Sequence, residues 1–355
     1  MVISQISLTE IPSPFIIFKK SIAEGSPLIQ KLYLYQSDRY DPYYNLAVEK
    51  LLLDRVAPGE CILYLWQNQN TVVIGKNQNA WAECRTSLLE SEGGHLARRL
   101  SGGGAVFHDL GNLNFTFLVR DEDYDVDRQL SVIQAAVRLA GVQTEKSGRN
   151  DVLADGRKFS GNAFYHQNGH AYHHGTLMVD VDKDKLQRYL SPSKAKLEAK
   201  GVASVRSRVV NLSELSPGLT CDKLRSLMVQ AFESVYALPS FPFILTDEDM
   251  HEIEETAKIN ESWDFLFGTR LPFTFECEGR FPWGGVQIQL EAKSGMVTAA
   301  KVYSDSMDWQ LAPMIEQALT GCRFSEDAMM QAIRTALGSS DASTDLCGLI
   351  QDQQL

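Results

Sequence analysis

Residues 95 to 109 read His95-Leu-Ala-Arg-Arg-Leu-Ser-Gly-Gly-Gly-Ala-Val-Phe-His-Asp109, and this stretch guides the interpretation of the whole chain. Glycine inside an element costs roughly 0.5–1 kcal/mol relative to alanine, so three consecutive glycines between apolar runs need a backbone reason. Gly102, Gly103 and Gly104 allow main-chain N–H groups to turn toward a bound anion, and Arg98 and Arg99 add positive charge. The stretch indicates a phosphate or carboxylate site, with a flexible hairpin turn as the alternative.

Composition is that of a globular protein with two domains. The chain has 355 residues, 44% of them hydrophobic and 22% charged, and domains typically hold about 150 residues. No apolar run approaches the roughly 18–20 residues that span a bilayer, and no secretory signal is recognisable. The six cysteines form no C-x-x-C pair, so we expect reduced thiols. These features predict a cytoplasmic protein that has no membrane partner.

Charge is distributed unevenly along the chain. The net charge of −11 argues against nucleic acid as the main partner. Residues 231–355 carry 20 acidic and 7 basic side chains, whereas residues 1–230 carry 25 acidic and 27 basic ones. Within the first part, residues 183–208 are distinctly basic and include Lys194 and Lys196. This segment is either a docking surface for an acidic macromolecule or a solvated helical face.

Hydrophobic periodicity predicts a mixed α+β sheet. Strands are expected at 31–36, 61–66, 71–74 and 112–119, and helices from Asp41 to about Val56, over 80–91 and over 126–140. Residues 95–109 are expected to form a loop. We divide the chain into an N-terminal extension (1–30), a large domain (31–268) and a small α/β accessory domain (269–355).

A hairpin in the middle of the chain positions a candidate catalytic lysine. Asp155-Gly156 is a two-residue turn signal, so the flanking strands should aim Asp151 and Lys158 into one shared space. An ammonium within the segment Gly156-Arg-Lys-Phe-Ser-Gly161 can act as an electrostatic clamp on a reacting phosphate. The alternative interpretation is an ordinary surface lysine, and the neighbouring motifs argue against it.

Several motifs taken together resemble the lipoate–protein ligases. They are Arg98-Arg-Leu-Ser-Gly-Gly-Gly-Ala-Val-Phe-His108, Gly148-Arg-Asn-Asp151, Gly156-Arg-Lys-Phe-Ser-Gly161 and His173-His-Gly-Thr176, with further similarity in 41–49, 72–79, 205–212 and 280–285. The resemblance covers about residues 31–337. It implies a biotin/lipoate ligase-type catalytic domain, related to class II aminoacyl-tRNA synthetases, with a small C-terminal accessory domain.

The resemblance also implies a two-step reaction. Lipoate and ATP, with Mg²⁺, would form lipoyl-AMP and pyrophosphate, and a lysine of an acceptor would then attack the mixed anhydride. The implied acceptors are apo lipoyl domains of 2-oxoacid dehydrogenase complexes and the glycine cleavage H protein. Lipoate would be scavenged from outside the cell.

Site residues are carried over motif by motif. Lys158 would bridge the lipoate carboxylate and the α-phosphate, and Asp151 is a candidate magnesium ligand. The expected nucleotide and adenylate contacts are Arg99, Gly104, Ala105, Val106 and Phe107. The expected wall of the lipoyl tunnel comprises Asn45, Leu46, Val48 and Val73, for which core packing is an equally good explanation.

Two histidines lie beside motif residues, and one position departs from the family pattern. His108 and His174 either contact the ligand or hold loops, in support of the site together with Gly102 and Gly103. His173 and His174 are adjacent on a strand and should point to opposite faces, which argues against a shared metal site. Leu100 replaces a residue that is often basic in the family, and residues 1–30 have no counterpart.

Three other functions are alternatives to that of a ligase. An octanoyl or lipoyl transferase on the same fold would need a nucleophilic cysteine near the pocket, but no cysteine occurs between Cys84 and Cys221. A biotin ligase would carry its own Gly-Arg-rich loop pattern, which is absent. A non-catalytic carrier-binding protein would not require Lys158 together with the glycine stretch.

Overall fold

The computed structural model describes residues 29–147, 151–191, 209–268 and 272–353. Its largest element is an eight-stranded mixed sheet with the order β11-β1-β2-β6-β10-β9-β8-β7. The pairs β1–β2 and β1–β11 are parallel and the remaining pairs are antiparallel. The strands are β1 (Lys31–Gln36), β2 (Glu60–Trp66), β6 (Asn112–Arg120), β7 (Glu145–Ser147), β8 (Asp151–Ala154), β9 (Arg157–Gln167), β10 (His170–Met178) and β11 (Ser240–Pro242).

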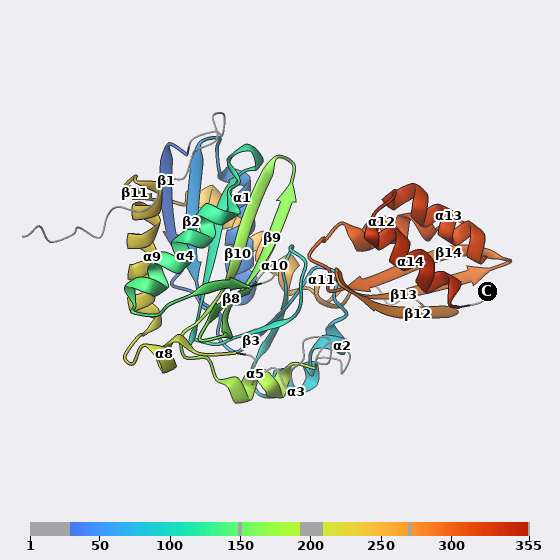
Figure 1. The fold of residues 1–355 in the computed structure, drawn as a ribbon, viewed down its shortest axis with the longest axis horizontal. Coiled ribbons are helices and arrows are strands. Elements are labelled where there is room, and N and C mark those ends of the chain that lie inside the picture. Colours follow the sequence, from blue (N-terminus) through green and yellow to red (C-terminus); the bar gives the residue numbers. More distant parts are fainter. Residues whose placement is uncertain (1–28, 148–150, 192–208, 269–271, 354–355) are drawn as a thin grey trace, which may run out of the picture.

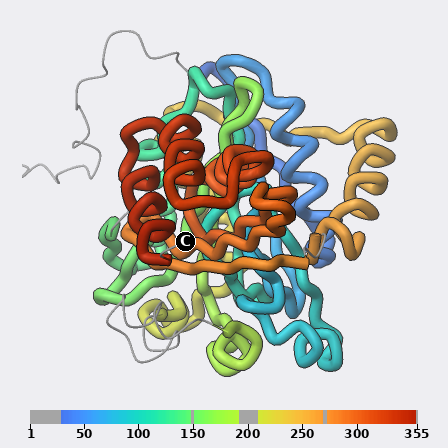
Figure 2. The backbone as a smooth tube through the Cα atoms, turned by 90° about the vertical axis from the view of Figure 1, so that its right-hand side faces the viewer, coloured from blue at the N-terminus to red at the C-terminus, as the bar shows by residue number. Residues whose placement is uncertain are grey.

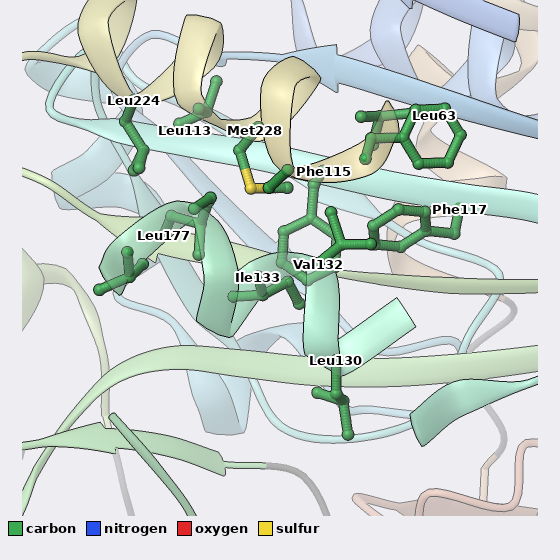
Figure 3. Close-up of a cluster of buried hydrophobic side chains, with 14 of the residues drawn as sticks. Leu63, Leu113, Phe115, Phe117, Leu130, Val132, Ile133, Leu177, Leu224 and Met228 are labelled. Carbon is green, nitrogen blue, oxygen red and sulfur yellow. The ribbon is translucent and has the colours of Figure 1, made fainter. Parts of the chain in front are cut away.

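One face of this sheet is covered by α4 (Val126–Leu139) and α9 (Cys221–Tyr236). Both helices are amphipathic, and their apolar sides meet inward-facing residues of β2, β6 and β10. Phe115, Phe117 and Ile133 are fully buried in this core, which Figure 3 shows in close-up. The residues that alternate with these along the strands point to the opposite face of the sheet.

The opposite face packs against α1 (Pro42–Arg55) and a small three-stranded sheet. Helix α1 begins as expected, because the Asp41 side chain accepts from the Tyr43 and Tyr44 N–H groups and Pro42 occupies the first turn. The small sheet has the order β4-β3-β5 and comprises β3 (Thr71–Ile74), β4 (His95–Arg98) and β5 (Val106–His108). The expectation that 95–109 is entirely loop is therefore wrong at both ends.

Short helices surround the small sheet and connect the two parts of the chain. The helix expected over 80–91 is broken in two at residues 84 and 85. The remaining helices of this part are α2 (Ala80–Glu83), α3 (Thr86–Ser91), the 3₁₀ turn η1 (Asp121–Asp123), α5 (Lys183–Tyr189), α8 (Leu212–Leu215), α10 (Asp247–Glu261) and α11 (Trp263–Phe267). None of the helices in the described ranges is both long and apolar enough to cross a bilayer.

The C-terminal part is a separate sheet-and-helix unit with its own core. Its strands β12 (Phe275–Phe281), β13 (Gly284–Lys293) and β14 (Met296–Ser304) form an antiparallel sheet. Three helices lie on one side of that sheet: α12 (Leu311–Leu319), α13 (Glu326–Leu337) and α14 (Asp341–Gln351). Figure 2 looks at the molecule from this side, with the C-terminal helices in front.

The turn between β14 and α12 contacts the large part of the chain. Asn77 accepts a hydrogen bond from the Ser304 N–H (N–O 2.9 Å) and donates its side-chain amide to the Trp309 carbonyl (2.7 Å). The Trp309 ring contacts the Lys76 ammonium, 4.0 Å from the ring centroid, and the Tyr165 ring, whose centroid is 5.0 Å away. This turn thereby brings the C-terminal unit up to the glycine stretch.

Candidate active site

A cavity of about 210 Å³ lies between the large sheet and the small sheet. Its floor comes from β6, β9 and β10, and its roof from β3, β5 and the glycine stretch. The lining residues include most of those singled out from the sequence. They are Leu46, Trp66, Val73, Glu83, Arg99, Gly103, Gly104, Ala105, Val106, Phe107, His108, Asn112, Asn114, Asp151, Lys158, Gly161, Asn162, Ala163, His174, Gly175, Thr176, Met178, Leu186, Leu190 and Val209.

Lys158 and Asp151 meet at one end of this cavity, as the hairpin predicts. The turn residues Asp155 and Gly156 both have left-handed φ, 52° and 68°, which is the conformation of a two-residue hairpin loop. The Lys158 Nζ atom lies 2.7 Å from Asp151 Oδ1, and these side chains are only 20% and 12% exposed. A half-buried ammonium beside one carboxylate forms a fixed positive group on the cavity wall.

Gly161 leaves the space that the Lys158 ammonium occupies. A Cβ atom on Gly161 would stand 2.7 Å from Lys158 Nζ and 2.9 Å from its Cε. The Gly161 N–H donates to Thr176 Oγ1 (3.2 Å), which ties β9 to β10 at this level. Any larger side chain at 161 would therefore push the ammonium away from its position.

The Arg99 guanidinium holds the glycine stretch from inside. Its Nε donates to Ser101 Oγ (3.1 Å), Nη1 to the Val73 carbonyl (3.2 Å), and Nη2 to the Gly102 and Gly104 carbonyls (2.7 and 2.8 Å). Burial lowers the pKa of Arg99 to about 10, so the side chain stays charged at neutral pH. Arg99 lines the cavity, but in this conformation most of its donors are engaged by the loop.

Two of the three glycines contact the C-terminal unit. The Gly103 N–H donates to the Ser306 carbonyl (2.9 Å), and a Cβ atom on Gly102 would stand 2.3 Å from the same oxygen. The expectation that the Gly103 N–H faces a bound anion is therefore wrong for this structure. Gly104, Ala105, Val106 and Phe107 do line the cavity.

Arg98 points away from the cavity, which contradicts its expected role as an anion-facing charge. Its guanidinium donates to the carbonyls of α11 residues Phe265 (2.9 Å) and Leu266 (3.1 Å). It also donates to carbonyls of the turn after β3, at Gly75 (3.1 Å), Lys76 (2.8 Å) and Gln78 (2.8 Å). Burial lowers the pKa of Arg98 to about 10. Its role is to join α11 to the small sheet.

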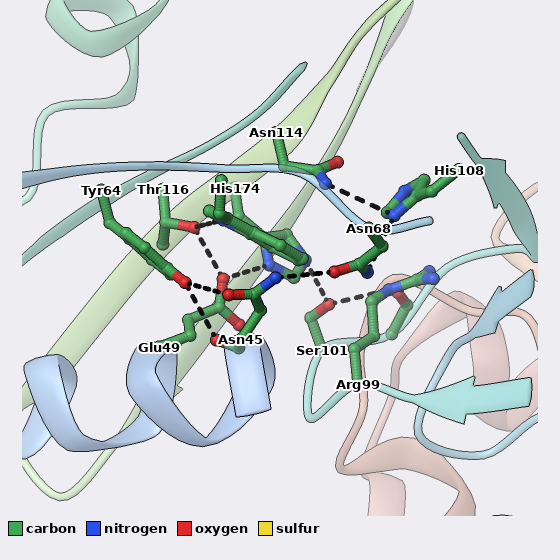
Figure 4. Close-up of polar contacts among 12 residues, drawn as sticks. Asn45, Glu49, Tyr64, Asn68, Arg99, Ser101, His108, Asn114, Thr116 and His174 are labelled. Atoms are coloured by element: carbon green, nitrogen blue, oxygen red, sulfur yellow. Dashed lines mark hydrogen bonds and ion pairs between the residues drawn. The ribbon is translucent and has the colours of Figure 1, made fainter. Parts of the chain in front are cut away.

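A chain of buried polar groups runs from α1 to the glycine stretch (Figure 4). Glu49 Oε1 lies 2.8 Å from His174 Nδ1, and His174 Nε2 lies 2.8 Å from Ser101 Oγ. Glu49 also accepts from Thr116 Oγ1 (2.7 Å). Because the carboxylate accepts from Nδ1, the His174 Nε2 atom is left to accept from the Ser101 hydroxyl.

Sequence reasoning missed Glu49 and Ser101. Glu49 lies one turn after Asn45 on the buried side of α1 and is only 2% exposed. A carboxylate at such a position is uncommon unless it is paired, and this was the signal that could have identified it.

The two adjacent histidines of β10 serve opposite faces of the sheet, as expected. His173 contacts Asn162 Oδ1 (2.8 Å) and Gln129 Oε1 (3.2 Å) on the α4 side. His174 contacts Glu49 and Ser101 on the α1 side. Within the described ranges, no three His, Cys, Asp or Glu side chains are grouped so that they could hold a metal ion.

Of the four residues expected along the acyl tunnel, two line the cavity. Leu46 and Val73 line the cavity, whereas Val48, which is also on α1, is buried in the hydrophobic core. Asn45 is fully buried, and its amide donates to the Gln67 carbonyl (2.9 Å) and to Asn68 Oδ1 (3.0 Å). The structure thus places Asn45 in the support of the turn after β2.

Two other sequence features lie outside the residues that the structure describes. Lys194 and Lys196, from the basic segment, lie outside the described residues, as does the N-terminal extension up to residue 28.

The cysteines are free thiols, and Cys61, Cys84, Cys277 and Cys347 are buried. No cysteine is among the described residues that line the cavity.

Comparison with known proteins gives matches to both parts of the chain. A model described as the lipoyl protein ligase A/B catalytic domain matches residues 41–233, and one described as the bacterial lipoate protein ligase C-terminus matches residues 271–343. The lipoate-protein ligase A of Bdellovibrio bacteriovorus is 39% identical over 317 residues, which cover 87% of this chain and 94% of that protein.

Solved structures share the fold. LipL1 of P. falciparum in complex with lipoate has a TM-score of 0.78 at 24% identity, and covers 90% of this chain and 99% of its own. A lipoate-protein ligase A bound with ATP has a TM-score of 0.59 at 23% identity, over 67% of this chain and 98% of its own. The expected fold class, a large mixed sheet with a small C-terminal domain, is confirmed.

Proposed function

This chain belongs to the lipoate–protein ligase family, and we propose that it activates lipoate with ATP and transfers the lipoyl group to a lysine of apo lipoyl domains. Activation is needed because a carboxylate is a poor acyl donor. The proposed acceptors are E2 subunits of 2-oxoacid dehydrogenase complexes and the glycine cleavage H protein. A solved relative is described as part of an archaeal lipoylation system with its E2 lipoyl domain.

The observation that carries the proposal is the Lys158 ammonium on the cavity wall, fixed by Asp151 and by the space over Gly161. In the first step a lipoate carboxylate oxygen attacks the α-phosphorus of ATP, and pyrophosphate leaves with the electrons of the broken P–O bond. Lys158 would contact both the carboxylate and the α-phosphate and counter the negative charge that they bring together. A fixed cation aimed at this position lowers the barrier without reorganisation.

The glycine stretch is proposed to hold the nucleotide. Gly104, Ala105, Val106 and Phe107 lie on the cavity wall, where their backbone can approach an adenylate closely. Arg99 fixes the carbonyls of this stretch and keeps a positive charge behind it. Leu46 and Val73 supply apolar surface for the lipoyl chain.

Asp151 fits the role of a magnesium ligand. Mg²⁺ is commonly held by one or two carboxylates together with substrate phosphates, and Asp151 supplies one carboxylate beside the proposed phosphate position. When bound, the ion would neutralise charge on the ATP phosphates. In this structure the Asp151 carboxylate is paired with Lys158. From this position it would contact either the Lys158 ammonium or a bound magnesium ion.

The thioester route of the related transferases receives no support from the described residues. Cys84 and Cys221 are the cysteines that flank the central motifs in sequence, and burial raises the pKa of each thiol to about 12. A thiol that stays protonated is a poor nucleophile. In the proposed second step the acceptor lysine therefore attacks the lipoyl-AMP carbonyl directly, forms the amide and releases AMP.

The test is the mass of an apo lipoyl domain after incubation with the protein and lipoate. With ATP and Mg²⁺ present, we expect a mass increase equal to one lipoyl amide, and no increase without nucleotide. Equal modification with and without ATP would contradict the adenylation route. Release of pyrophosphate in the absence of the acceptor domain separates the first step from the second.

A further inference from the structure

His108 is a buried cavity residue with one ring nitrogen unaccounted for. Its side chain is only 3% exposed and lines the cavity beside Trp66 and Asn114. The Nδ1 atom lies 3.3 Å from Asn68 Nδ2 and 3.4 Å from Asn114 Nδ2. No described group is a hydrogen-bond partner of Nε2. A buried polar atom in this state needs an explanation.

The surrounding hydrogen bonds determine which ring nitrogen carries the proton. Asn45 Oδ1 accepts from Tyr64 Oη (3.0 Å), so its Nδ2 is the donor to Asn68 Oδ1 (3.0 Å). Asn68 therefore presents its NH₂ group to His108. Asn114 does the same, because its Oδ1 accepts from Asn112 Nδ2 (2.8 Å).

Two amide donors directed at Nδ1 make that nitrogen an acceptor, so the proton resides on Nε2. Burial lowers the pKa of His108 to about 3, which keeps the ring neutral near neutral pH. The His108 Nε2–H group is thus a fixed donor on the wall of the cavity.

This donor lies across the sheet from Lys158. The Lys158 ammonium stands over Gly161 on β9, Gly161 bonds to Thr176 on β10, and Thr176 pairs with Asn114 on β6. Two interstrand spacings of about 4.8 Å separate β9 from β6, so the Asn114 backbone is roughly 10 Å from Gly161, and the His108 ring lies beside the Asn114 side chain. An extended acid whose carboxylate contacts Lys158 would present its far end to His108.

We propose that His108 recognises the dithiolane ring of lipoate through its Nε2–H and thereby selects lipoate over a plain fatty acid of similar length. The proposal rests on the proposed function, which makes lipoate the substrate. Ring sulfurs have lone pairs that accept weak hydrogen bonds and are polarisable, as sulfur in methionine is. The terminal methyl group of octanoate has no acceptor and would leave the buried donor unpaired.

The expected preference is modest, because sulfur is a weak acceptor. Sites that hydrogen-bond a substrate group reject analogues that lack it, since a buried polar group is then unpaired. We expect lipoate to bind about tenfold more tightly than octanoate, which corresponds to about 1.4 kcal/mol. Because the dithiolane lies far from the reacting carboxylate, the effect should appear mainly in KM and less in kcat.

The test measures binding of three acids by Trp fluorescence without nucleotide: lipoate, octanoate, and 5-cyclopentylpentanoate, in which methylene groups replace both sulfurs. The proteins are the natural chain, His108→Leu and His108→Gln. We expect a roughly tenfold preference of the natural chain for lipoate over the cyclopentyl acid. His108→Leu should abolish that preference, and His108→Gln, which retains an N–H donor, should restore part of it.

The control variant is His166→Gln, because His166 is exposed and pairs with Asp121 away from the cavity. It should keep the natural preference. Equal ratios of lipoate to cyclopentyl acid binding in the natural chain and in His108→Leu would overturn the proposal. The binding measurement needs no ATP. A protein that shows a His108-dependent preference for lipoate but makes no adenylate would contradict the proposed function and leave the role of His108 standing.

Circular dichroism of each variant, taken at the binding temperature, checks that the variant is folded under the conditions of the binding measurement. Should His108→Leu not fold, the comparison of His108→Gln with the natural chain decides, and a preference for lipoate that is reduced but retained supports a donor at 108. A complete loss of that preference in a folded His108→Gln would contradict the proposed hydrogen bond.

Discussion

His174 lies between Glu49, on α1, and Ser101, at the start of the glycine stretch, with 2.8 Å contacts to each. Ser101 in turn accepts from Arg99 (3.1 Å), so a helix 50 residues earlier in the chain restrains the loop that is proposed to hold the adenylate. The restraint depends on the carboxylate, because it sets the ring tautomer of His174.

Replacing Glu49 with glutamine should weaken this restraint. We expect the free energy of unfolding to fall by about 1–3 kcal/mol, because a charge-assisted bond inside the protein is lost. Pyrophosphate release should slow by roughly tenfold as the loop loses its fixed position. Denaturant titration and a pyrophosphate assay check the two effects. Glu248→Gln, at an exposed position, is the control and should leave both quantities unaltered.

Replacing Lys158 with alanine should abolish most adenylate formation. Removing one preorganised group that stabilises developing charge costs about 10²–10³ in rate. Arg157→Ala is the matched control, because Arg157 is the neighbouring basic residue and its nearest ion pairs, with Asp155 and Glu214, are longer than 3.5 Å. A Lys158→Ala protein that released pyrophosphate at the normal rate would contradict the assigned role.

Acid should destabilise the protein through its buried histidines. Burial lowers the pKa values of His108 and His173 to about 3, whereas an unfolded histidine titrates near 6.5. Between these values the unfolded chain binds more protons, so the free energy of unfolding must fall as pH drops below about 6.5. Urea titrations between pH 7 and 4.5 measure the slope.

The histidine contribution to that slope can be separated with variants. His173→Gln should reduce the slope over this pH range by up to one proton, because glutamine does not titrate. His251→Gln, at an exposed position, should leave the slope as it is. An equal slope in the natural chain and in His173→Gln would show that His173 is accessible to protons in the folded state.

Gly102→Ala should separate the glycine stretch from the C-terminal unit. The new methyl group would stand 2.3 Å from the Ser306 carbonyl oxygen, which is far inside van der Waals contact. We expect a larger radius of gyration in small-angle X-ray scattering. Gly348→Ala is the control, since no atom lies within 4 Å of the Cβ position there. Unaltered scattering from Gly102→Ala would mean that the contact between residue 102 and Ser306 accommodates the methyl group without separating the two parts of the chain.

Much of the fold follows from local signals. Asp41 and Pro42 start α1 where the capping preferences place it, and the Asp155-Gly156 turn yields the hairpin that brings Lys158 to Asp151. Both depend on residues close together in sequence, whose backbone preferences are decided locally. The helix expected over 80–91 was less well predicted, because residues 84 and 85 leave helical conformation.

The less predictable features depend on distant partners. Arg98 binds carbonyls of α11, more than 160 residues later, and Gly103 bonds to Ser306, about 200 residues later. Neither partner is visible in the composition of the glycine stretch. An arginine beside glycines suits an anion or a set of carbonyls equally well, and only the tertiary structure decides between them.

The two neighbouring histidines of β10 affect how the register of this strand is specified. A slip of β10 by one residue would turn every side chain to the other face. His173, whose partners are the amides of Asn162 and Gln129, would then face the Glu49 carboxylate, and His174 would lose its acidic partner to an amide environment. A misaligned β10 would thus still offer Glu49 an imidazole, so the penalty for the wrong register comes from the apolar residues: Ala171 and Leu177 would leave the core under α4 and α9, and Tyr172 would enter it.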